Sequence, residues 1–348
     1  MKRFIDENRN VYGVEPICKV LPIAPSTYYA QVAREVNPDK QPARTQRDAR
    51  LRVQIRALWE ENYHVYGVRK VWRQLQRDAV EVARCTVERL MRQMGICGVV
   101  RGRPAKTTVR DLALPCPADW VNRQFRAPRP NALWVADFTY VPTQRGFVYV
   151  AFVIDVFARR IVGWRVSRSL RTDFVLDALE QALHRRKRAD GEPLIHHSDR
   201  GSQYVSVRYT DRLNDAAVQP SVGSVGDSYD NTLAETINGL YKAEVIHRRT
   251  SWTDAQAVEL ATLVWVDWFN RRRLLGPIGY IPPAEAEARY YAAIRESAMA
   301  AWLTIRSLRD SRGGSFGSRS TPVGALAGNS PIGRARTRQP SHFEMKTS

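Results

Sequence analysis

Residues 133–167 decide the fold of the chain, and their sequence is LWVADFTYVPTQRGFVYVAFVIDVFARRIVGWRVS. Three runs in this stretch are rich in valine, isoleucine and aromatic residues, which favour β-strands, and tight turns separate them. We expect the strands at 133–141, 147–156 and 161–167, with the first turn at Gln144-Arg145-Gly146. The middle run is almost wholly apolar, which is typical of a strand buried on both faces. The stretch therefore predicts three consecutive antiparallel strands of one sheet.

Helical and extended patterns alternate after these strands. The expected elements are a helix at 173–188, a strand at 194–197, a helix near 207–217, a strand near 218–222 and a helix that starts near 230. The helices are recognised by apolar residues at three- and four-residue spacing, and the strands by short apolar runs. This order predicts an α/β fold in which helices flank a mixed five-stranded sheet. We assign residues 131–295 to this domain.

The region before the sheet is helical and strongly basic. We expect two short helices within 11–31, with a turn at Leu21 to Pro25 and Ser26 as a cap, and further helices at 44–62, 67–77 and 84–94. Residues 1–130 hold 25 basic and 13 acidic side chains, whereas residues 131–300 hold 21 and 20. Basic helices in series resemble a helix-turn-helix module, whose recognition helix enters the major groove of DNA. We therefore predict an N-terminal helical segment, 1–43, and a helix-turn-helix-like DNA-binding region, 44–106, with a purely structural helix pair as the alternative.

Two further segments lack apolar periodicity. Residues 107–130 have prolines within and beside them and are interpreted as a linker. Residues 301–348 carry eight basic and two acidic side chains, and glycine, serine, proline and arginine dominate from about Asp310. Segments of this composition bury too little apolar surface to offset their ordering entropy. We predict a disordered basic tail.

Bulk properties limit the class of protein. The net charge of +19 and the isoelectric point near 10.2 indicate a polyanionic partner, with a merely soluble basic protein as the alternative. The four cysteines lack the spacing of a zinc site, and the N-terminus lacks the apolar stretch of a signal peptide. The longest apolar run, 258–269, is too short for a bilayer and contains two acidic residues. We expect a cytoplasmic, nucleoid-associated protein that has no membrane partner.

Three acidic residues occupy positions where a carboxylate needs an explanation. Asp137 lies inside an otherwise apolar strand, Asp199 follows a short strand, and Glu235 lies one turn inside a helix. Singly, each has a structural alternative, either a buried Asp satisfied by backbone donors or a surface Glu. Strand ends in α/β sheets position ligands. Together, three converging carboxylates can hold two hard divalent cations about 4 Å apart, which stabilise an in-line phosphoryl displacement.

Longer motifs resemble one protein family. The order Asp137, Asp199, Glu235, with 35 residues between the last two, resembles the DDE signature of retroviral integrases and insertion-sequence transposases. Seven phrases look like those of the second-frame product of insertion-sequence-three elements: YGVRKVW (66–72), CTVERLM (85–91), WVADFTY (134–140), VIDVFARRIVGW (153–164), HSDRGSQY (197–204), DSYDNTLAE (227–235) and IPPAEA (281–286). The resemblance runs from about residue 1 to 295, and motifs this long and ordered are specific.

The resemblance implies a fold, a reaction and partners. The fold would be an RNase H-like integrase catalytic core preceded by a helical DNA-binding region. The activity would be that of a DDE polynucleotidyl transferase, which cleaves DNA and transfers strands at insertion-sequence ends. Asp137, Asp199 and Glu235 would be the catalytic residues and the ligands of two Mg²⁺ ions, with Mn²⁺ as a substitute. The partners would be the terminal repeats, target DNA, the upstream first-frame product and further copies of the chain on DNA.

Several other residues are candidates for DNA contacts. The family places a DNA-contacting basic residue at Lys242, two helical turns after Glu235, and a solvated helix lysine is the alternative. Arg101-Gly102-Arg103-Pro104 resembles the core of an AT-hook, whose arginines lie in a narrow minor groove, and a simple basic linker is the alternative. Four residues within or beside the family motifs complete the set: Arg69, Lys70, Tyr204 and Asn231.

Nearby polar residues receive other roles. Asp155 also lies in a strand, but it lacks the loop context of Asp199, so we expect a structural role. His196 and His197 are expected to support the site rather than bind metal, because hard cations prefer oxygen. Arg271 stands where relatives often have histidine. A DNA-binding regulator without chemistry and a nuclease of the same fold remain alternatives, although a regulator has no use for converging carboxylates near phosphates.

Overall fold

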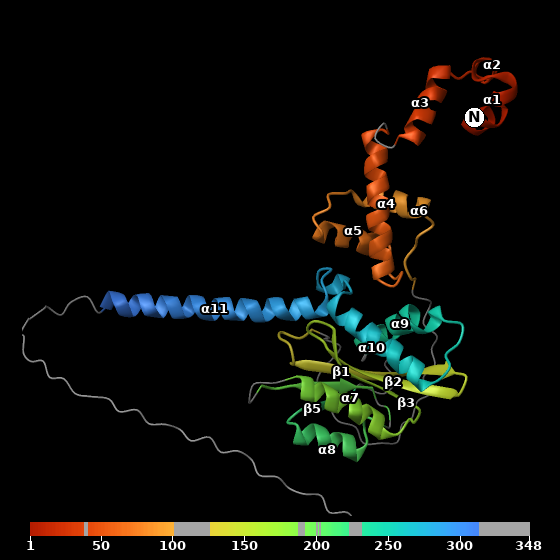
Figure 1. The fold of residues 1–348 in the computed structure, drawn as a ribbon. Coiled ribbons are helices and arrows are strands. Elements are labelled where there is room, and N and C mark those ends of the chain that lie inside the picture. Colours follow the sequence, from red (N-terminus) through yellow and green to blue (C-terminus); the bar gives the residue numbers. More distant parts are fainter. Residues whose placement is uncertain are drawn as a thin grey trace, which may run out of the picture. The chain divides into compact units, whose positions relative to one another are not determined.

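The computed structural model describes residues 1–37, 41–100, 126–186, 192–199, 201, 203–222 and 232–312. The chain forms two compact units, Met1–Ile294 and Arg295–Ser348. The first unit contains the predicted sheet domain and the helices that precede it (Figure 1).

The sheet has five strands in the order β3-β2-β1-β4-β5. The strands are β1 Leu133–Thr143, β2 Gly146–Asp155, β3 Arg160–Ser167, β4 Ile195–Ser198 and β5 Gln219–Val222. The pairs β1–β2 and β2–β3 are antiparallel, whereas β1–β4 and β4–β5 are parallel. The predicted mixed five-stranded sheet is confirmed, and the apolar middle strand β2 is buried along most of its length.

Helices cover both faces of the sheet (Figure 1). They are α7 Thr172–Arg185 and α8 Val207–Asp215 on one face, and α9 Thr232–Glu244 and α10 Ala255–Arg271 on the other. Because side chains alternate along a strand, β1 contributes to two cores. Trp134 and Ala136 pack in the cluster of α7 and α8, whereas Leu133 and Val135 pack in the cluster of α9 and α10. This alternation places residue 137 on the face covered by α9.

Three helices build the N-terminal segment, one more than predicted. They are α1 Lys2–Tyr12, α2 Val14–Val20 and α3 Pro25–Val36, and they bury a small core of Ile5, Ile17, Cys18 and Tyr28. The prediction missed α1, in which Ile5 is the one buried residue. Ser26 is not the cap of α3: the helix begins at Pro25, and Ala24 is its N-cap. Proline is favoured at the first helical position, where its missing N–H costs nothing.

The predicted helix-turn-helix-like region contains α4 Ala43–Glu61, α5 Val68–Arg77 and α6 Arg84–Gln93. The three helices share a core in which Ile55, Val71, Val87 and Leu90 are fully buried. That core is continuous with the α9–α10 side of the sheet.

Polar contacts attach this region to the segment around the end of α10. The Tyr66 hydroxyl donates to the Arg272 carbonyl at 3.0 Å and accepts from the Leu274 N–H at 2.8 Å. The Trp268 indole donates to the Asn62 side chain at 3.1 Å, inside the interface. The helix-turn-helix-like region and the sheet domain therefore share one hydrophobic core.

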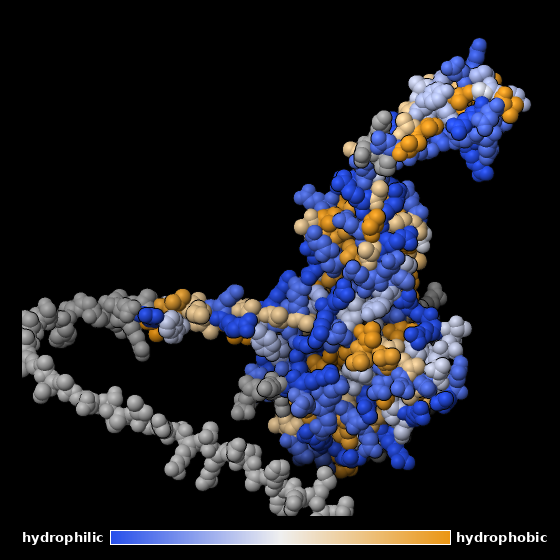
Figure 2. Space-filling view, viewed as in Figure 1, coloured by the Kyte–Doolittle hydropathy of each residue, from blue (hydrophilic) through white to orange (hydrophobic). Residues whose placement is uncertain are grey.

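Helix α11 spans Pro283–Arg312, so residues 301–312 of the predicted disordered tail are helical. Alanine, glutamate and arginine are strong helix formers, so the helix continues past its buried residues near Glu287. Large apolar side chains at Met299, Trp302 and Ile305 are more than half exposed, and hydrophobic patches alternate with hydrophilic ones along the helix (Figure 2). The rest of the predicted tail, 313–348, lies outside the described residues. None of the helices in the described ranges has the length and apolar character needed to cross a bilayer.

Candidate active site

Strand register brings Asp137 and Asp199 together, although 61 residues separate them in the sequence. In the parallel ladder of β1 and β4, Ala136 pairs with Ser198. Asp137 follows Ala136, and Asp199 follows Ser198. The two carboxylates therefore lie side by side at the carboxyl end of β4. The ends of neighbouring strands are where α/β sheets position ligands.

Helix α9 adds further side chains on the same face of the sheet. The Asn238 side chain donates a hydrogen bond from Nδ2 to Asp137 Oδ2 at 2.8 Å. Glu235 lies three residues earlier in the first turn of α9, and residues at this spacing share a helix face. Asn238 is buried, whereas Glu235 is exposed. Helical spacing from Glu235 would have singled out Asn238, which the sequence prediction did not include.

The local electrostatics reflect the crowding of negative charge. Burial, together with the nearby charges of Asp199 and Glu235, raises the pKa of Asp137 well above its usual value. Hydrogen bonds from the Phe138 N–H, at 2.8 Å, and from Asn238 oppose this rise. Burial also raises the pKa of Asp199, and the Gly201 N–H, 3.2 Å from Oδ1, opposes that rise. Neighbouring carboxylates in a poorly solvated place create a strong local demand for a cation.

The donor chemistry of this cluster fits a hard divalent cation. All three acidic groups offer carboxylate oxygens, which Mg²⁺ prefers. Asn238 Oδ1 is buried and accepts no hydrogen bond from the residues that the structure describes, so it could accept one from water held by a cation. Within the described ranges, no three His, Cys, Asp or Glu side chains are gathered closely enough to hold a metal. Asp137 and Asp199 lie side by side, and the exposed Glu235 would have to move closer to them to complete a ligand set.

Lys242 lies near this cluster, as its position on α9 predicted. Its Nζ lies over the Tyr140 ring, 4.8 Å from the centroid. Burial lowers the pKa of Lys242, and the charge of Asp137 opposes that change. The half-buried ammonium therefore lies close enough to Asp137 for their charges to interact.

Tyr204 differs from its predicted role in direct DNA contact. Its side chain is only 4% exposed and packs with Phe138 and Tyr209, so little of it is available to DNA. Its buried hydroxyl has no hydrogen-bond partner among the described residues. Burial, with smaller contributions from Tyr209, Asp137 and Asp199, raises the pKa of Tyr204. Tyr204 therefore forms part of the floor beneath the two aspartates.

The two histidines of β4 make contacts within the core. His196 Nε2 lies 3.1 Å from the Tyr209 hydroxyl, and His197 Nδ1 lies 2.9 Å from the Ser221 hydroxyl. Both imidazoles are buried. Burial lowers the pKa of His196 to about 3, so this ring is neutral. Their contacts match the expected supporting role.

Asp155 lies in a separate buried network. Its carboxylate accepts from the N–H groups of Asn131 and Phe157, at 2.7 and 3.0 Å, and pairs with Arg186 at 2.8 Å. Arg186 also pairs with Glu287 at the start of α11. This network ties β2 to the segments before β1 and after α7, which is a structural role.

The remaining candidates for DNA contact lie elsewhere. Arg69 and Lys70 belong to the first turn of α5, away from the carboxylates. Arg101, Arg103 and Asn231 lie outside the described residues.

Family comparisons agree with this architecture. Two integrase core domain families match residues 127–228 and 216–283, and an HTH-like domain family matches residues 46–104. Among solved structures, the catalytic core domain of HTLV-2 integrase in complex with magnesium is 16% identical, with a TM-score of 0.36, and the match covers 47% of this chain and 99% of that one.

Curated relatives match most of the chain. A transposase for insertion sequence element IS629 from Shigella sonnei is 58% identical over 301 residues, which are 86% of this chain and 100% of the relative. A putative transposase for insertion sequence element IS986/IS6110 from Mycobacterium tuberculosis is 55% identical over 276 residues, which are 78% of this chain and 97% of the relative. The chain thus belongs to the insertion-sequence transposases with an integrase core domain, of the insertion-sequence-three type.

Proposed function

We propose that this chain cleaves DNA at the ends of an insertion sequence and transfers the freed strands to target DNA, with Asp137, Asp199 and Glu235 as a DDE triad. The observation that carries the proposal is the β1–β4 register, which places the two aspartates side by side below the helix that bears Glu235. The polynucleotidyl transferase activity follows from the family. The adjacency of Asp137 and Asp199 and the family motif that contains Glu235 support the assignment of these three residues.

The three carboxylates would hold two Mg²⁺ ions, with Mn²⁺ as a substitute. Bound metal would supply charge neutralisation and Lewis acidity at the scissile phosphate. Asn238 fixes the orientation of Asp137 through its amide and keeps Oδ1 available for a polar ligand. Lys242 offers a positive charge beside Asp137, where a DNA phosphate would otherwise meet only carboxylates.

We place DNA recognition mainly in the helix-turn-helix-like region. Arg69 and Lys70 in α5 are its candidate contacts among the described residues, and Lys242 is the candidate within the sheet domain. Arg101, Arg103 and Asn231 remain predicted contacts from the sequence. The terminal repeats, the target DNA, the first-frame product and additional copies of the chain are the proposed partners.

The triad is tested with the conservative variants D137N, D199N and E235Q. The substrate is a DNA that carries the inverted repeats flanking the coding sequence, in Mg²⁺ buffer. Each variant should lose strand cleavage and joining by at least about a hundredfold, because each removes a charge that offsets the transition-state phosphate. DNA binding should stay within about twofold, since DNA affinity depends mainly on basic side chains.

The matched control is D211N, which neutralises an exposed aspartate on α8, on the other face of the sheet. It should retain full activity. If E235Q still joined strands as well as D211N does, the triad would be wrongly assigned. If the wild-type chain cleaved the DNA but did not join strands, the result would instead support a nuclease of the same fold.

A further inference from the structure

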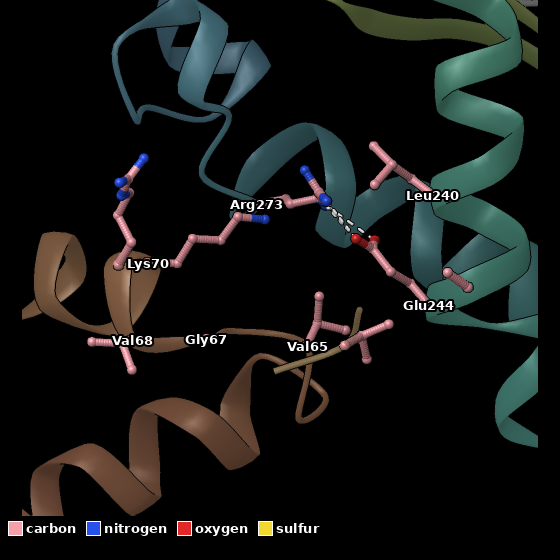
Figure 3. Close-up of a pocket in the computed structure, with 10 residues that line it drawn as sticks. Val65, Gly67, Val68, Lys70, Leu240, Glu244 and Arg273 are labelled. Atoms are coloured by element: carbon pink, nitrogen blue, oxygen red, sulfur yellow. Dashed lines mark hydrogen bonds and ion pairs between the residues drawn. The ribbon is translucent and has the colours of Figure 1, made fainter. Parts of the chain in front are cut away.

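A cavity of about 310 Å³ opens between the helix-turn-helix-like region and α9 (Figure 3). One wall is the start of α5 and the segment before it, and the other is the last part of α9 with the residue two positions after α10. Its lining consists of Val65, Gly67, Val68, Arg69, Lys70, Val99, Leu240, Ala243, Glu244 and Arg273. At roughly 30 Å³ per water molecule, this space can hold a small anionic group with several waters.

The acidic side chain that lines the cavity is already neutralised. Both carboxylate oxygens of Glu244 accept from Arg273, and the Trp265 indole donates to Oε2 at 3.1 Å. Glu244 and Arg273 are both buried, and Figure 3 shows their ion pair facing the cavity. Since this carboxylate is paired with Arg273, it is not available as a partner for the other cations of the lining.

Two cations of the lining have no such counter-charge. Lys70 extends from α5 toward the Arg273–Glu244 pair (Figure 3), and its Nζ lies 5.2 Å from the centroid of the Tyr66 ring. Arg69 donates to the Tyr280 hydroxyl at 3.4 Å. Among the residues that the structure describes, no carboxylate lies within ion-pair distance of Lys70 or Arg69. Apart from the paired Glu244 and Arg273, the charged or titratable side chains of the lining are therefore both basic.

The backbone adds to this preference for an anion. Gly67 is the N-cap of α5, and no side chain caps the helix. The first N–H groups of a helix lack intrahelical acceptors and carry the positive end of the helix dipole. Val68 and Arg69, at the start of this helix, are among the residues that line the cavity.

We propose that this cavity binds a phosphate group of the DNA backbone and that Lys70 is its principal contact. The proposal deepens the proposed function, on which it rests, by assigning one phosphate of the bound DNA to the junction between the DNA-binding region and α9. DNA is the favoured source because the cavity lies beside the first turn of a helix in the basic region, and phosphate groups bind at helix N-termini. Helix α9 carries Glu235 at its other end, so the bound phosphate would contact the helix that supplies the third carboxylate.

The protonation state of Lys70 provides a distinctive signature. Burial, and then the charge of Arg273, lowers the pKa of Lys70 to about 7, and Glu244 opposes the change. The groups that face it are Arg273 and Glu244 from the sheet domain, with Arg69 and Tyr66 from its own region. Lys70 is charged below this pKa and neutral above it, so free protein should bind the phosphate more weakly as the pH rises through 7. A bound phosphate would raise the pKa again, so binding takes up protons.

The test measures binding of the full chain to a short random-sequence DNA duplex in EDTA, so that catalysis plays no part. The variants are K70Q, K70R and the control K19Q, which removes the charge of an exposed lysine on α2. K70Q should weaken binding about tenfold below pH 7 and reduce the slope of log affinity against log salt by about 0.9, the value for one phosphate. K70R should keep the affinity and lose the pH dependence, because arginine stays charged. K19Q should keep the pH dependence of the wild type.

Three outcomes would overturn the proposal. One is an unchanged pH dependence in K70Q. Another is a failure of K70R to restore affinity although it melts like the wild type, which would point to a purely structural lysine. The third is a combination of two results: inorganic phosphate stabilises the wild type but not K70Q, and K70Q has the same salt dependence of DNA binding as the wild type. That combination would assign the cavity to a free anion. An inactive triad would leave these binding results unchanged, so the two proposals can fail separately.

Discussion

The side chain of Asn238 donates to that of Asp137 across 2.8 Å, from helix α9 to strand β1. This hydrogen bond connects the central aspartate of the site to the helix that carries Glu235. It uses Nδ2, and within the described part of the chain the buried Oδ1 has no hydrogen-bond donor. Asn238 thus orients one carboxylate and offers an acceptor beside it.

Asn238→Leu should preserve the fold and reduce strand transfer by about tenfold to a hundredfold, the usual cost of losing a residue that orients a metal ligand. The Mg²⁺ concentration for half-maximal activity should rise, because Asp137 is no longer held. Titration of strand transfer with Mg²⁺ checks both effects. N214A, which truncates an exposed asparagine on α8, is the control and should match the wild type. Equal Mg²⁺ requirements for N238L and N214A would contradict the positioning role.

Asp155→Asn should destabilise the protein by about 3 kcal/mol, because it breaks a buried, hydrogen-bonded ion pair with Arg186. Its specific activity should be nearly normal at temperatures where it is folded. Thermal denaturation and strand transfer on the same preparation separate the two effects. D177N, which removes an exposed pair with Arg165, should cost less than about 1 kcal/mol. A D155N protein that melts normally but is inactive would place Asp155 in the catalytic machinery.

His196 should make the folded state sensitive to acid. Its ordinary pKa of 6.5 applies in the unfolded chain, whereas burial lowers the pKa to about 3 in the folded chain. The unfolded state therefore binds a proton that the folded state rejects. The contribution of the neutral His196 ring to the free energy of unfolding is complete above pH 6.5. As the pH falls toward 3, the free energy of unfolding decreases by up to about 1.4 kcal/mol per pH unit.

Denaturant unfolding across this pH range checks the prediction. His196→Gln should show a shallower loss of unfolding free energy with acid than the wild type. H184Q, at an exposed position on α7, should follow the wild type. Identical slopes for H196Q and H184Q would rule out His196 as the source.

Tyr66→Phe should lower the free energy of unfolding by about 2 kcal/mol, because it leaves the Arg272 carbonyl and the Leu274 N–H without their hydroxyl partner. The lost contacts join the helix-turn-helix-like region to the sheet domain, so limited proteolysis between them should accelerate. Y63F, at an exposed tyrosine, is the matched control and should be neutral. Unchanged proteolysis in Y66F would show that the two regions are held together by other contacts.

The sequence by itself predicted the five-stranded sheet and singled out two acidic residues as candidates for the site. Alternating and continuous apolar patterns depend only on which side chains face a core. The approximate bounds of strands β1 to β5 could therefore be predicted from the spacing of apolar residues. Asp137 and Asp199 stood out because a carboxylate in or after an apolar strand conflicts with local preference. The difference in net charge between the N-terminal region and the sheet domain likewise follows from the numbers of basic and acidic residues in the sequence.

Tertiary structure decided the contacts that cross the chain. Asn238 could be linked to Asp137, and Tyr66 to Arg272, only once packing had brought distant segments within hydrogen-bond distance. Burial likewise separated Tyr204 from DNA, although its family motif suggested contact. The local sequence determines whether apolar side chains recur at the spacing of a helix or of a strand, because this spacing involves only residues close together in the chain. The partners of a side chain depend on strand register and helix docking, which are set by the free energy of the whole packed interior.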